Sequence, residues 1–202
     1  MTLSPQVARS RKSVYAIVLA AGTASRFGAT KQTAEFDGKP MVRRCLDAAG
    51  DACGEQTVLV VGHDWQSVVS ACEPTRSRIE RNDRYEEGLG TSIACGVQSV
   101  RYRADAVIIM LADQPLVTAD HIRQLIDAWS GNTNEIVATS FSETQGPPTL
   151  FASGCFDELC ALTGDTGGKR LFTDRRFTLE SIAFEPAGVD IDKPEDVKRS
   201  EP

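Results

Sequence analysis

Apolar runs and amphipathic stretches alternate along the chain, and this alternation predicts strands that alternate with helices. Two continuous apolar runs, at residues 14–19 and 106–111, are typical of central strands buried on both faces of a parallel sheet. Shorter apolar runs predict three further strands, at residues 57–61, 78–80 and 135–140. Amphipathic stretches predict helices at residues 40–49, 65–72, 93–100, 119–129 and 156–162, and a last helix after Pro194.

Polar and special residues mark the ends of these helices. Asp64, the pair Thr91-Ser92 and Thr118 each precede an amphipathic stretch, and we expect them to act as N-caps, because their side-chain oxygens accept hydrogen bonds from free backbone N–H groups. Pro40 suits a first helical turn, and Gly50 is predicted to end the same helix.

The order of the elements predicts an α/β fold. Strands that alternate with helices favour a three-layer, Rossmann-like arrangement with a mostly parallel sheet and right-handed crossovers. Residues 141–184 depart from strict alternation and predict a small hairpin or lid over the sheet edge in the C-terminal half. Residues 1–13 are polar and basic and predict a flexible tail, which leaves residues 14–202 as a single domain.

Composition excludes several classes of protein. Hydrophobic content of 41% and charged content of 25% are ordinary for a soluble globular chain, and no apolar stretch is long enough for a membrane helix. A net charge of −6 argues against binding to nucleic acid. Six scattered cysteines without a CxxC motif or a signal-peptide pattern predict reduced thiols and a cytoplasmic location. The two histidines are too far apart to suggest a zinc site.

A loop of small residues follows the first predicted strand. It reads Leu19-Ala20-Ala21-Gly22-Thr23-Ala24-Ser25-Arg26-Phe27-Gly28-Ala29-Thr30-Lys31. Ligands of open α/β sheets bind outside the carboxyl ends of the strands, so this loop is either a phosphate cradle completed by Arg26 and Lys31 or an ordinary β-to-α turn. The spacing matches neither the Walker A loop nor the dinucleotide fingerprint.

Carboxylates supply candidate ligands for a divalent cation. Asp113 lies at the carboxyl end of the strand at 106–111, two residues before Pro115, and is either a Mg2+ ligand or a turn aspartate. Asp190 and Asp192 share one face of an extended segment, where either one is a second metal ligand or Asp192 caps the helix after Pro194. The loop at residues 164–170 either holds an acceptor phosphate or closes a surface turn.

Several motifs, in order along the chain, resemble the MobA-like nucleotidyltransferases, and within them the molybdenum cofactor cytidylyltransferases. These motifs are Leu19-Ala20-Ala21-Gly22, Arg26-Phe27-Gly28, Lys31, Asp37-Gly38-Lys39-Pro40, the segment 82–92, Leu111-Ala112-Asp113-Gln114-Pro115, Gly146-Pro147-Pro148, Gly164-Asp165-Thr166-Gly167-Gly168 and the segment 190–196. The chain departs from the family in the polar run at residues 32–35 and slightly at Gly168-Lys169-Arg170.

The resemblance implies a nucleotidyltransferase fold and a reaction. The reaction is the Mg2+-dependent transfer of CMP from CTP to molybdenum-bound molybdopterin, with molybdopterin cytosine dinucleotide and pyrophosphate as products; Mn2+ is the other metal that fits. Ala21 favours the cytidine branch, because the guanylyltransferases of the family tend to carry glycine there.

The resemblance also implies roles for individual residues. The expected catalytic residues are Arg26, Lys31 and Asp113, and the expected metal ligands are Asp113 and Asp192. The expected nucleotide-binding residues are Leu19, Ala20, Ala21, Gly22, Arg26, Gly28, Lys31, Gly62, Asn82, Ser92 and Asp113.

Two other classes of function remain open. The same fold serves transferases of other nucleotides or other acceptor phosphates, such as guanylyltransferases and sugar-phosphate nucleotidyltransferases. A molybdopterin-binding accessory protein without catalysis would serve a molybdoenzyme or its insertion chaperone, and relatives of the family occur as accessory factors for purine-degrading molybdoenzymes. The chain contains Lys31, Asp113 and Asp192, and these three charged residues favour an enzyme over a carrier, because a carrier without catalysis would not need all of them.

Overall fold

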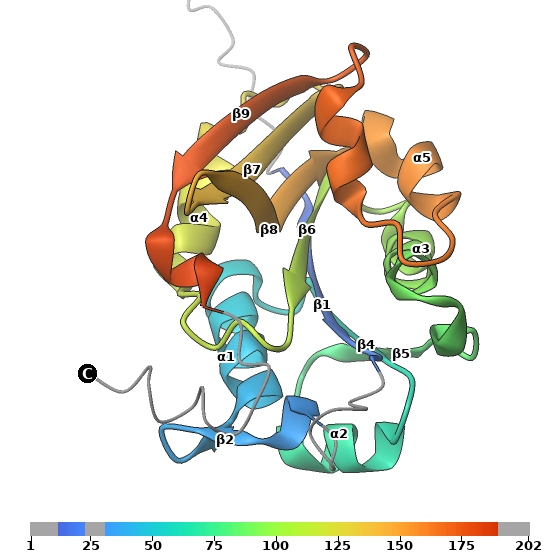
Figure 1. Cartoon of the computed structure of the whole chain (residues 1–202), viewed down its shortest axis with the longest axis vertical. Helices are drawn as coiled ribbons and strands as arrows, with labels where there is room; N and C mark the ends of the chain where they lie inside the picture. The colour runs from blue at the N-terminus through green and yellow to red at the C-terminus, as the bar shows by residue number, and fades with distance from the viewer. Residues whose placement is uncertain (1–11, 23–30, 190–202) are drawn as a thin grey trace, which may run out of the picture.

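A seven-stranded sheet forms the centre of the protein in the computed structural model, which describes residues 12–22 and 31–189 (Figure 1). The strand order is β5-β4-β1-β6-β8-β7-β9. The strands are β1 (Val14–Ala20), β4 (Thr57–Val61), β5 (Arg78–Arg81), β6 (Ala106–Leu111), β7 (Glu135–Phe141), β8 (Thr144–Ala152) and β9 (Thr178–Ala183). Within this sheet only β8 runs antiparallel to its neighbours. The predicted α/β class with a mostly parallel sheet is therefore confirmed.

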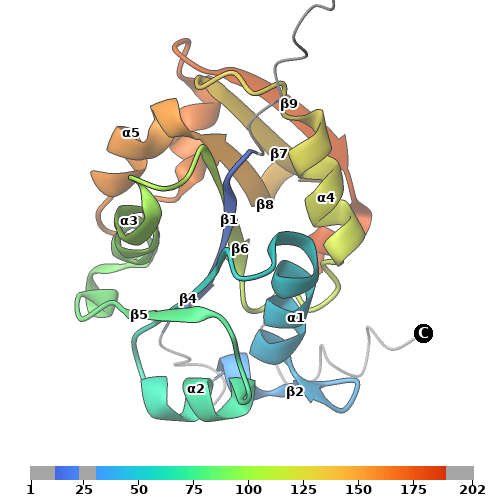
Figure 2. The ribbon, with the colours of Figure 1, turned by 180° about the vertical axis from the view of Figure 1, so that it is seen from behind.

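Helices cover both faces of the sheet and complete three layers. On one face, α1 (Met41–Cys53) packs beside α4 (Ala119–Ala128), with α2 (Trp65–Cys72) next to α1; on the other lie α3 (Leu89–Val100) and α5 (Phe156–Cys160) (Figure 2). The side chains of β1 alternate between the two layers, since Ala16 and Val18 face α1 and Ile17 and Leu19 face α3. A strand buried on both faces explains why its sequence is continuously apolar.

The predicted strand positions agree closely with the structure, whereas some helix ends were predicted wrongly. The helix α3 begins at Leu89, so Thr91 and Ser92 lie inside its first turn and do not precede it. Asp64 occupies the N-cap position of α2, but its side chain makes no capping bond to the backbone and instead accepts a hydrogen bond from Ser67 Oγ (2.9 Å). Thr118 caps α4 as predicted, with its Oγ1 accepting the His121 N–H at 3.2 Å.

Glycine does not end α1 where the sequence predicted it. Gly50 continues the helix, and the chain leaves it at Gly54, whose φ of 63° lies in the left-handed region. Gly54 rather than Gly50 therefore has the backbone conformation that favours glycine at a helix end.

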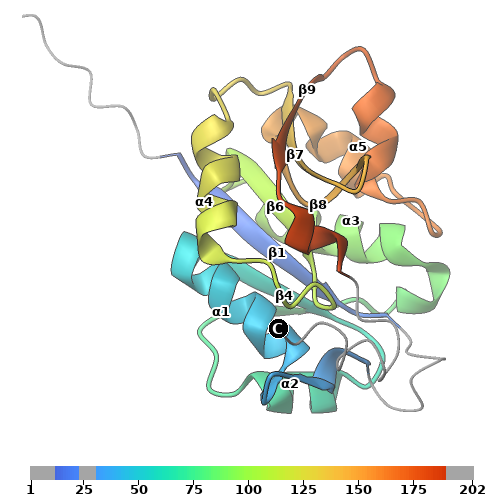
Figure 3. The same cartoon turned by 60° about the vertical axis from the view of Figure 1, so that its left-hand side comes forward.

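The irregular C-terminal half contains the predicted hairpin, and this hairpin belongs to the main sheet. Ser142 and Glu143 form its two-residue turn, with φ of 45° and 61°, and β8 then inserts between β6 and β7. The β7–β8 ladder skips two residues, because Ala138 pairs with Thr149 and Thr139 pairs with Gly146. Pro147 and Pro148, which lack N–H groups, occupy this bulge. A separate small hairpin joins β2 (Glu35–Phe36) to β3 (Lys39–Pro40) (Figure 3).

One of the two histidines and three of the six cysteines are buried in the core. His121 is buried, stacks on Phe184 with ring centroids 4.2 Å apart, and has a pKa lowered by burial. All six cysteines are free, and burial, with the nearby Asp113 carboxylate, raises the pKa of Cys45 to about 12. Among the helices of the described ranges, none has the length and apolar character that a bilayer crossing requires.

Candidate functional site

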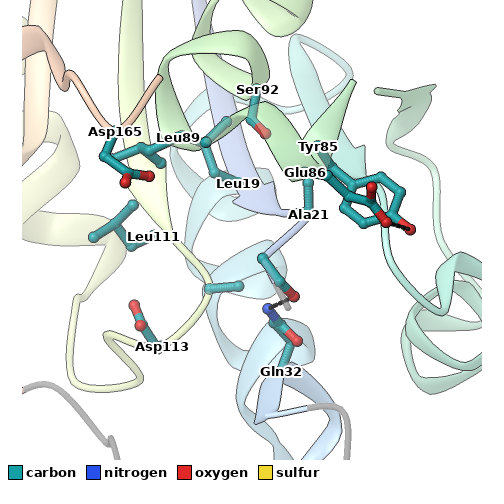
Figure 4. Close-up of a pocket in the computed structure, with 13 residues that line it drawn as sticks. Leu19, Ala21, Gln32, Tyr85, Glu86, Leu89, Ser92, Leu111, Asp113 and Asp165 are labelled. Carbon is teal, nitrogen blue, oxygen red and sulfur yellow. Dashed lines mark hydrogen bonds between the residues drawn. The ribbon is translucent and has the colours of Figure 1, made fainter. Parts of the chain in front are cut away.

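A pocket of about 360 Å³ opens at the carboxyl ends of β1 and β6 (Figure 4). Leu19 and Ala21 form one side at the end of β1, and Leu111 and Asp113 form another at the end of β6. The first turn of α3 contributes Ser92, and the remaining lining residues are Gly22, Gln32, Tyr85, Glu86, Gly88, Leu89, Ala112 and Asp165. The pocket therefore lies where parallel α/β sheets hold their ligands.

An ion pair joins the two predicted charged residues of this site that the structure describes. Lys31, at the start of a short 3-10 helix (Lys31–Thr33), places its Nζ 2.8 Å from Oδ2 of Asp113. The two side chains are 14% and 26% exposed, so the pair is partly shielded from water and from salt screening. The fold thus brings together a cation and a carboxylate that are 82 positions apart in the sequence.

Three buried acceptor oxygens without partners belong to Asp113 and to the residues that follow Lys31 and Asp113 in the sequence. Among the described residues, the buried side-chain polar atoms that lack a hydrogen-bond partner are Gln32 Oε1, Asp113 Oδ1 and Gln114 Oε1. Each is an oxygen that accepts hydrogen bonds or binds cations, and burying such an atom unpaired costs about 1–3 kcal/mol. The site is therefore short of donors and of positive charge, which a ligand or a cation would supply.

Gln32 connects the exit of the small-residue loop to its start. Its Nε2 donates to the Gly22 carbonyl at 3.1 Å, and its side chain is buried beside the pocket. This contact gives a structural reason for a polar residue directly after Lys31. Gln32 belongs to the site, which the sequence did not predict.

Close packing at Gly62 fixes Tyr85 and Ala21, two residues that line the pocket, relative to each other. A Cβ at Gly62 would lie 2.6 Å from Tyr85 Cβ and 2.8 Å from the Ala21 carbonyl oxygen, so only glycine fits between them. The following N–H, of His63, donates to the same Ala21 oxygen at 3.4 Å. The end of β4 is thereby attached to the start of the small-residue loop.

This packing predicts contrasting effects of two glycine substitutions. Gly62→Ala is expected to destabilise the protein by about 1–3 kcal/mol, because the added methyl group must displace Tyr85 or Ala21. Gly50→Ala is the matched control and is expected to stabilise it by about 0.5–1 kcal/mol, because its Cβ would meet open space within α1. Equilibrium unfolding in urea measures both, and equal free-energy changes in the two variants would contradict the packing argument.

Asn82 positions the first turn of α3. Its Nδ2 donates to Thr91 Oγ1 at 2.9 Å and to Ser92 Oγ at 3.0 Å, and its Oδ1 accepts the Arg84 N–H at 3.0 Å. Asn82 is buried and does not line the pocket, whereas Ser92 does. In this geometry Asn82 orients Ser92. That Asn82 also contacts the nucleotide directly stays a prediction.

The structure gathers most of the predicted site residues that it describes. Leu19, Ala21, Gly22, Ser92 and Asp113 line the pocket, whereas the Ala20 side chain packs into the core on the α1 side. The predicted residues Arg26, Gly28, Asp190 and Asp192, and the helix expected after Pro194, lie outside the described residues.

Sequence reasoning missed the contact between two glycine-containing segments at the rim. Gly88, with φ of 105°, crosses Gly164 so closely that a Cβ would lie 2.4 Å from the Gly164 carbonyl carbon. Tyr85, Glu86, Leu89 and Asp165 enter the pocket because of this crossing. Both segments belong to the motifs on which the family resemblance rests, and these motifs were the sequence signal that could have identified the contact.

A doubly wound α/β sheet with a pocket and an ion pair at its carboxyl edge defines an α/β protein whose ligand site lies outside the carboxyl ends of its strands. Comparison with known families narrows this class. The chain belongs to the family of the MobA-like NTP transferase domain, whose model matches residues 16–180, and it is a nucleotidyltransferase of that family.

Three relatives illustrate the similarity. Purine catabolism protein PucB from Bacillus subtilis is 28% identical over 163 residues, which is 77% of this chain and 78% of PucB. Bifunctional protein GlmU from Clostridium botulinum is 31% identical over 138 residues, 66% of this chain but only 29% of GlmU. The crystal structure of Rv0371c from Mycobacterium tuberculosis has a TM-score of 0.80 at 26% identity, covering 94% of this chain and 98% of Rv0371c, and Rv0371c has also been solved in complex with manganese.

Proposed function

We propose that the protein transfers CMP from CTP to molybdenum-bound molybdopterin and releases pyrophosphate. The observation that carries the proposal is the Lys31–Asp113 pair, with its unpartnered Asp113 Oδ1, beside the start of the small-residue loop. Membership in the MobA-like family supports nucleotidyl transfer. Cytidine and molybdopterin follow from Ala21 and from the motifs shared with molybdenum cofactor cytidylyltransferases. The scattered, reduced cysteines favour action in the cytoplasm, with a molybdoenzyme or its insertion chaperone receiving the product.

The donor atoms of the site fit a Mg2+ ion. Mg2+ prefers oxygen ligands and is usually held by one or two carboxylates together with substrate phosphates and water. Asp113 offers a buried carboxylate oxygen without a partner, and the described residues contain no cluster of three or more His, Cys, Asp or Glu side chains that would hold a metal alone. We assign Asp113 as one ligand and propose Asp192 as the second. When bound, the metal would neutralise charge on the phosphates; Mn2+ has the same ligand preference.

The residues of the chain act by holding two anions together. A phosphate monoester has a second pKa near 6 and is largely a dianion at pH 7, so an oxygen of the acceptor phosphate attacks the α-phosphorus without a strong base. The bond to the β-phosphate breaks as the new P–O bond forms, and pyrophosphate leaves. No histidine lines the described pocket, which agrees with a reaction that needs no proton acceptor.

Cationic side chains and backbone N–H groups stabilise the charge in this scheme. The Lys31 ammonium donates to a phosphate oxygen, Arg26 grips two oxygens as a planar fork, and the loop from Ala21 to Gly28 surrounds the triphosphate. Gly62 and Ser92 contact the ribose or the base. Positioning and electrostatic stabilisation together provide the rate acceleration.

Pyrophosphate release with each of the four common nucleoside triphosphates tests this function. Purified protein is mixed with Mg2+, molybdenum-loaded molybdopterin and one triphosphate, and we expect release with CTP only and loss of release in EDTA. Release with GTP alone identifies a guanylyltransferase, and release with a sugar phosphate in place of molybdopterin identifies a different acceptor. Tight pterin binding without release from any triphosphate identifies a carrier, and each of these results refutes the proposed reaction.

A further inference from the structure

A second pocket of about 360 Å³ adjoins the first. The two pockets share four lining residues, Leu19, Leu89, Leu111 and Asp165. The second pocket extends from these residues over β6 and β8 toward residues 167–172. A molecule held in it would therefore lie directly beside a nucleotide held in the first pocket.

Most of the wall of the second pocket is apolar and aromatic. Ile109, Phe141 and Phe151 come from the sheet, and Phe172 comes from the 3-10 helix Gly168–Thr173. The chain at Gly168 passes so close to the sheet that a Cβ there would lie 2.6 Å from Phe151 Cζ. Apolar walls with few polar groups are typical of pockets that enclose flat, ring-shaped ligands.

Gln114 places one hydrogen-bond acceptor at this pocket. Its Nε2 donates to the Ala187 carbonyl at 2.8 Å and to the Pro147 carbonyl at 3.3 Å. These two carbonyls fix the orientation of the Gln114 amide. In a flipped amide, Oε1 would face the two carbonyl oxygens, and an amide oxygen has no hydrogen to donate to them. Oε1 is left buried and without a partner among the described residues, in a side chain that is 2% exposed and lines the pocket. A ligand with an N–H group would satisfy it.

Lys169 supplies a positive charge to the lining of this pocket. It is exposed, its Nζ lies 3.4 Å from the Cβ position at Gly146, and no carboxylate in the described ranges forms an ion pair with it. The next residue, Arg170, differs, because its guanidinium is 3.2 Å from Glu158 and does not line the pocket. Lys169 and Arg170 are thus adjacent in the sequence, but within the described ranges Lys169 lines the pocket whereas Arg170 pairs with Glu158.

We propose that the second pocket binds the acceptor as a flat heteroaromatic anion that carries N–H groups. Its ring lies between the aromatic walls, an N–H donates to Gln114 Oε1, and its negative charge faces Lys169. This assignment rests on the proposed function, since it takes the ligand of the second pocket to be the acceptor of the reaction. Lys169 and Gln114 then determine acceptor specificity, and the β1 side of the site determines nucleotide specificity.

Binding of pterin-6-carboxylate, a fluorescent heteroaromatic anion, tests the pocket without requiring any turnover. We expect saturable binding to the wild-type protein, at least tenfold weaker binding to Lys169→Ala, and less than twofold change for Arg170→Ala. Saturating CTP with Mg2+ is not expected to displace the probe, because the nucleotide occupies the first pocket. 2-Naphthoate, a flat carboxylate without N–H groups, is expected to bind at least tenfold more weakly than pterin-6-carboxylate, as measured by displacement of the fluorescent probe.

Three results would overturn this assignment. They are failure of the probe to bind, equal affinity in wild type and Lys169→Ala with both proteins folded by circular dichroism, and competitive displacement by CTP. Steady-state kinetics then connects the pocket to the reaction, since Lys169→Ala should raise the acceptor KM and leave the CTP KM unchanged. Probe binding that depends on Lys169, without turnover of CTP, would refute the proposed reaction and retain the pocket.

Discussion

Asp113→Asn is expected to reduce CTP turnover by about two to three orders of magnitude, the range found when one preorganised group that stabilises transition-state charge is removed. The substitution preserves the shape of the side chain but removes the negative charge that faces Lys31 and the proposed metal. The free energy of unfolding is expected to change by less than about 2 kcal/mol, because the carboxylate is a quarter exposed and the pair is not fully desolvated.

A carboxylate elsewhere on the surface provides the control. Asp120 also pairs with a cation, Arg123, but lies in the first turn of α4, away from the pocket, and is 86% exposed. Asp120→Asn is expected to leave turnover within twofold of wild type. Pyrophosphate release at several Mg2+ concentrations is the measurement, and an Asp113→Asn protein that retains half of the wild-type turnover would exclude Asp113 as a metal ligand.

Lys31→Ala is expected to lower turnover by about 100-fold, since the ammonium group contacts phosphate oxygens whose charge grows in the transition state. The melting temperature should change little in comparison. Lys39→Ala is the matched control, because Lys39 pairs with Asp47 on the surface and such exposed pairs contribute little. Unchanged turnover in Lys31→Ala would remove this lysine from the catalytic machinery.

Lys31 and Asp113 are in direct contact, so the losses of turnover caused by the two substitutions are not expected to multiply. Adding Lys31→Ala to the Asp113→Asn protein is expected to lower turnover by a smaller factor than Lys31→Ala does in the wild-type protein. The reason is that the side chain that pairs with Lys31 has already lost its charge. Fully multiplicative losses in the double-mutant cycle would show that Lys31 and Asp113 act independently.

The strands and the location of the pocket were accessible from the sequence for a clear physical reason. β1 and β6 are buried on both faces, so their apolar runs are continuous, and the residues that follow them necessarily lie at the same edge of a parallel sheet. That geometry places Ala21 and Asp113 at one edge, whereas Lys31 follows the small-residue loop, and its ion pair with Asp113 was not predicted from the sequence. Strand alternation likewise made the α/β class predictable.

Other parts of the site depend on packing that leaves no local pattern. Tyr85 and Asp165 reach the pocket because Gly88 crosses Gly164, a contact between positions far apart in the sequence. The start of α3 was misplaced because Thr91 resembles an N-cap, whereas its hydroxyl contacts the Gly88 carbonyl from within the first turn. Gln32 appeared only as a departure from the family until its bond to Gly22 was visible.

The two-proline bulge of β8 has a consequence for how the molecule can diversify. Pro147 and Pro148 pair with neither β6 nor β7, so the sheet opens at this point, and the second pocket lies where the pairing stops. Of the two pockets, the bulge and the segment 167–172 line only the second, and they belong to other elements than β1 and Lys31, which we assign to the nucleotide side. On the proposed assignment, descendants of this chain can therefore acquire new acceptors while the machinery that activates the nucleotide is inherited intact.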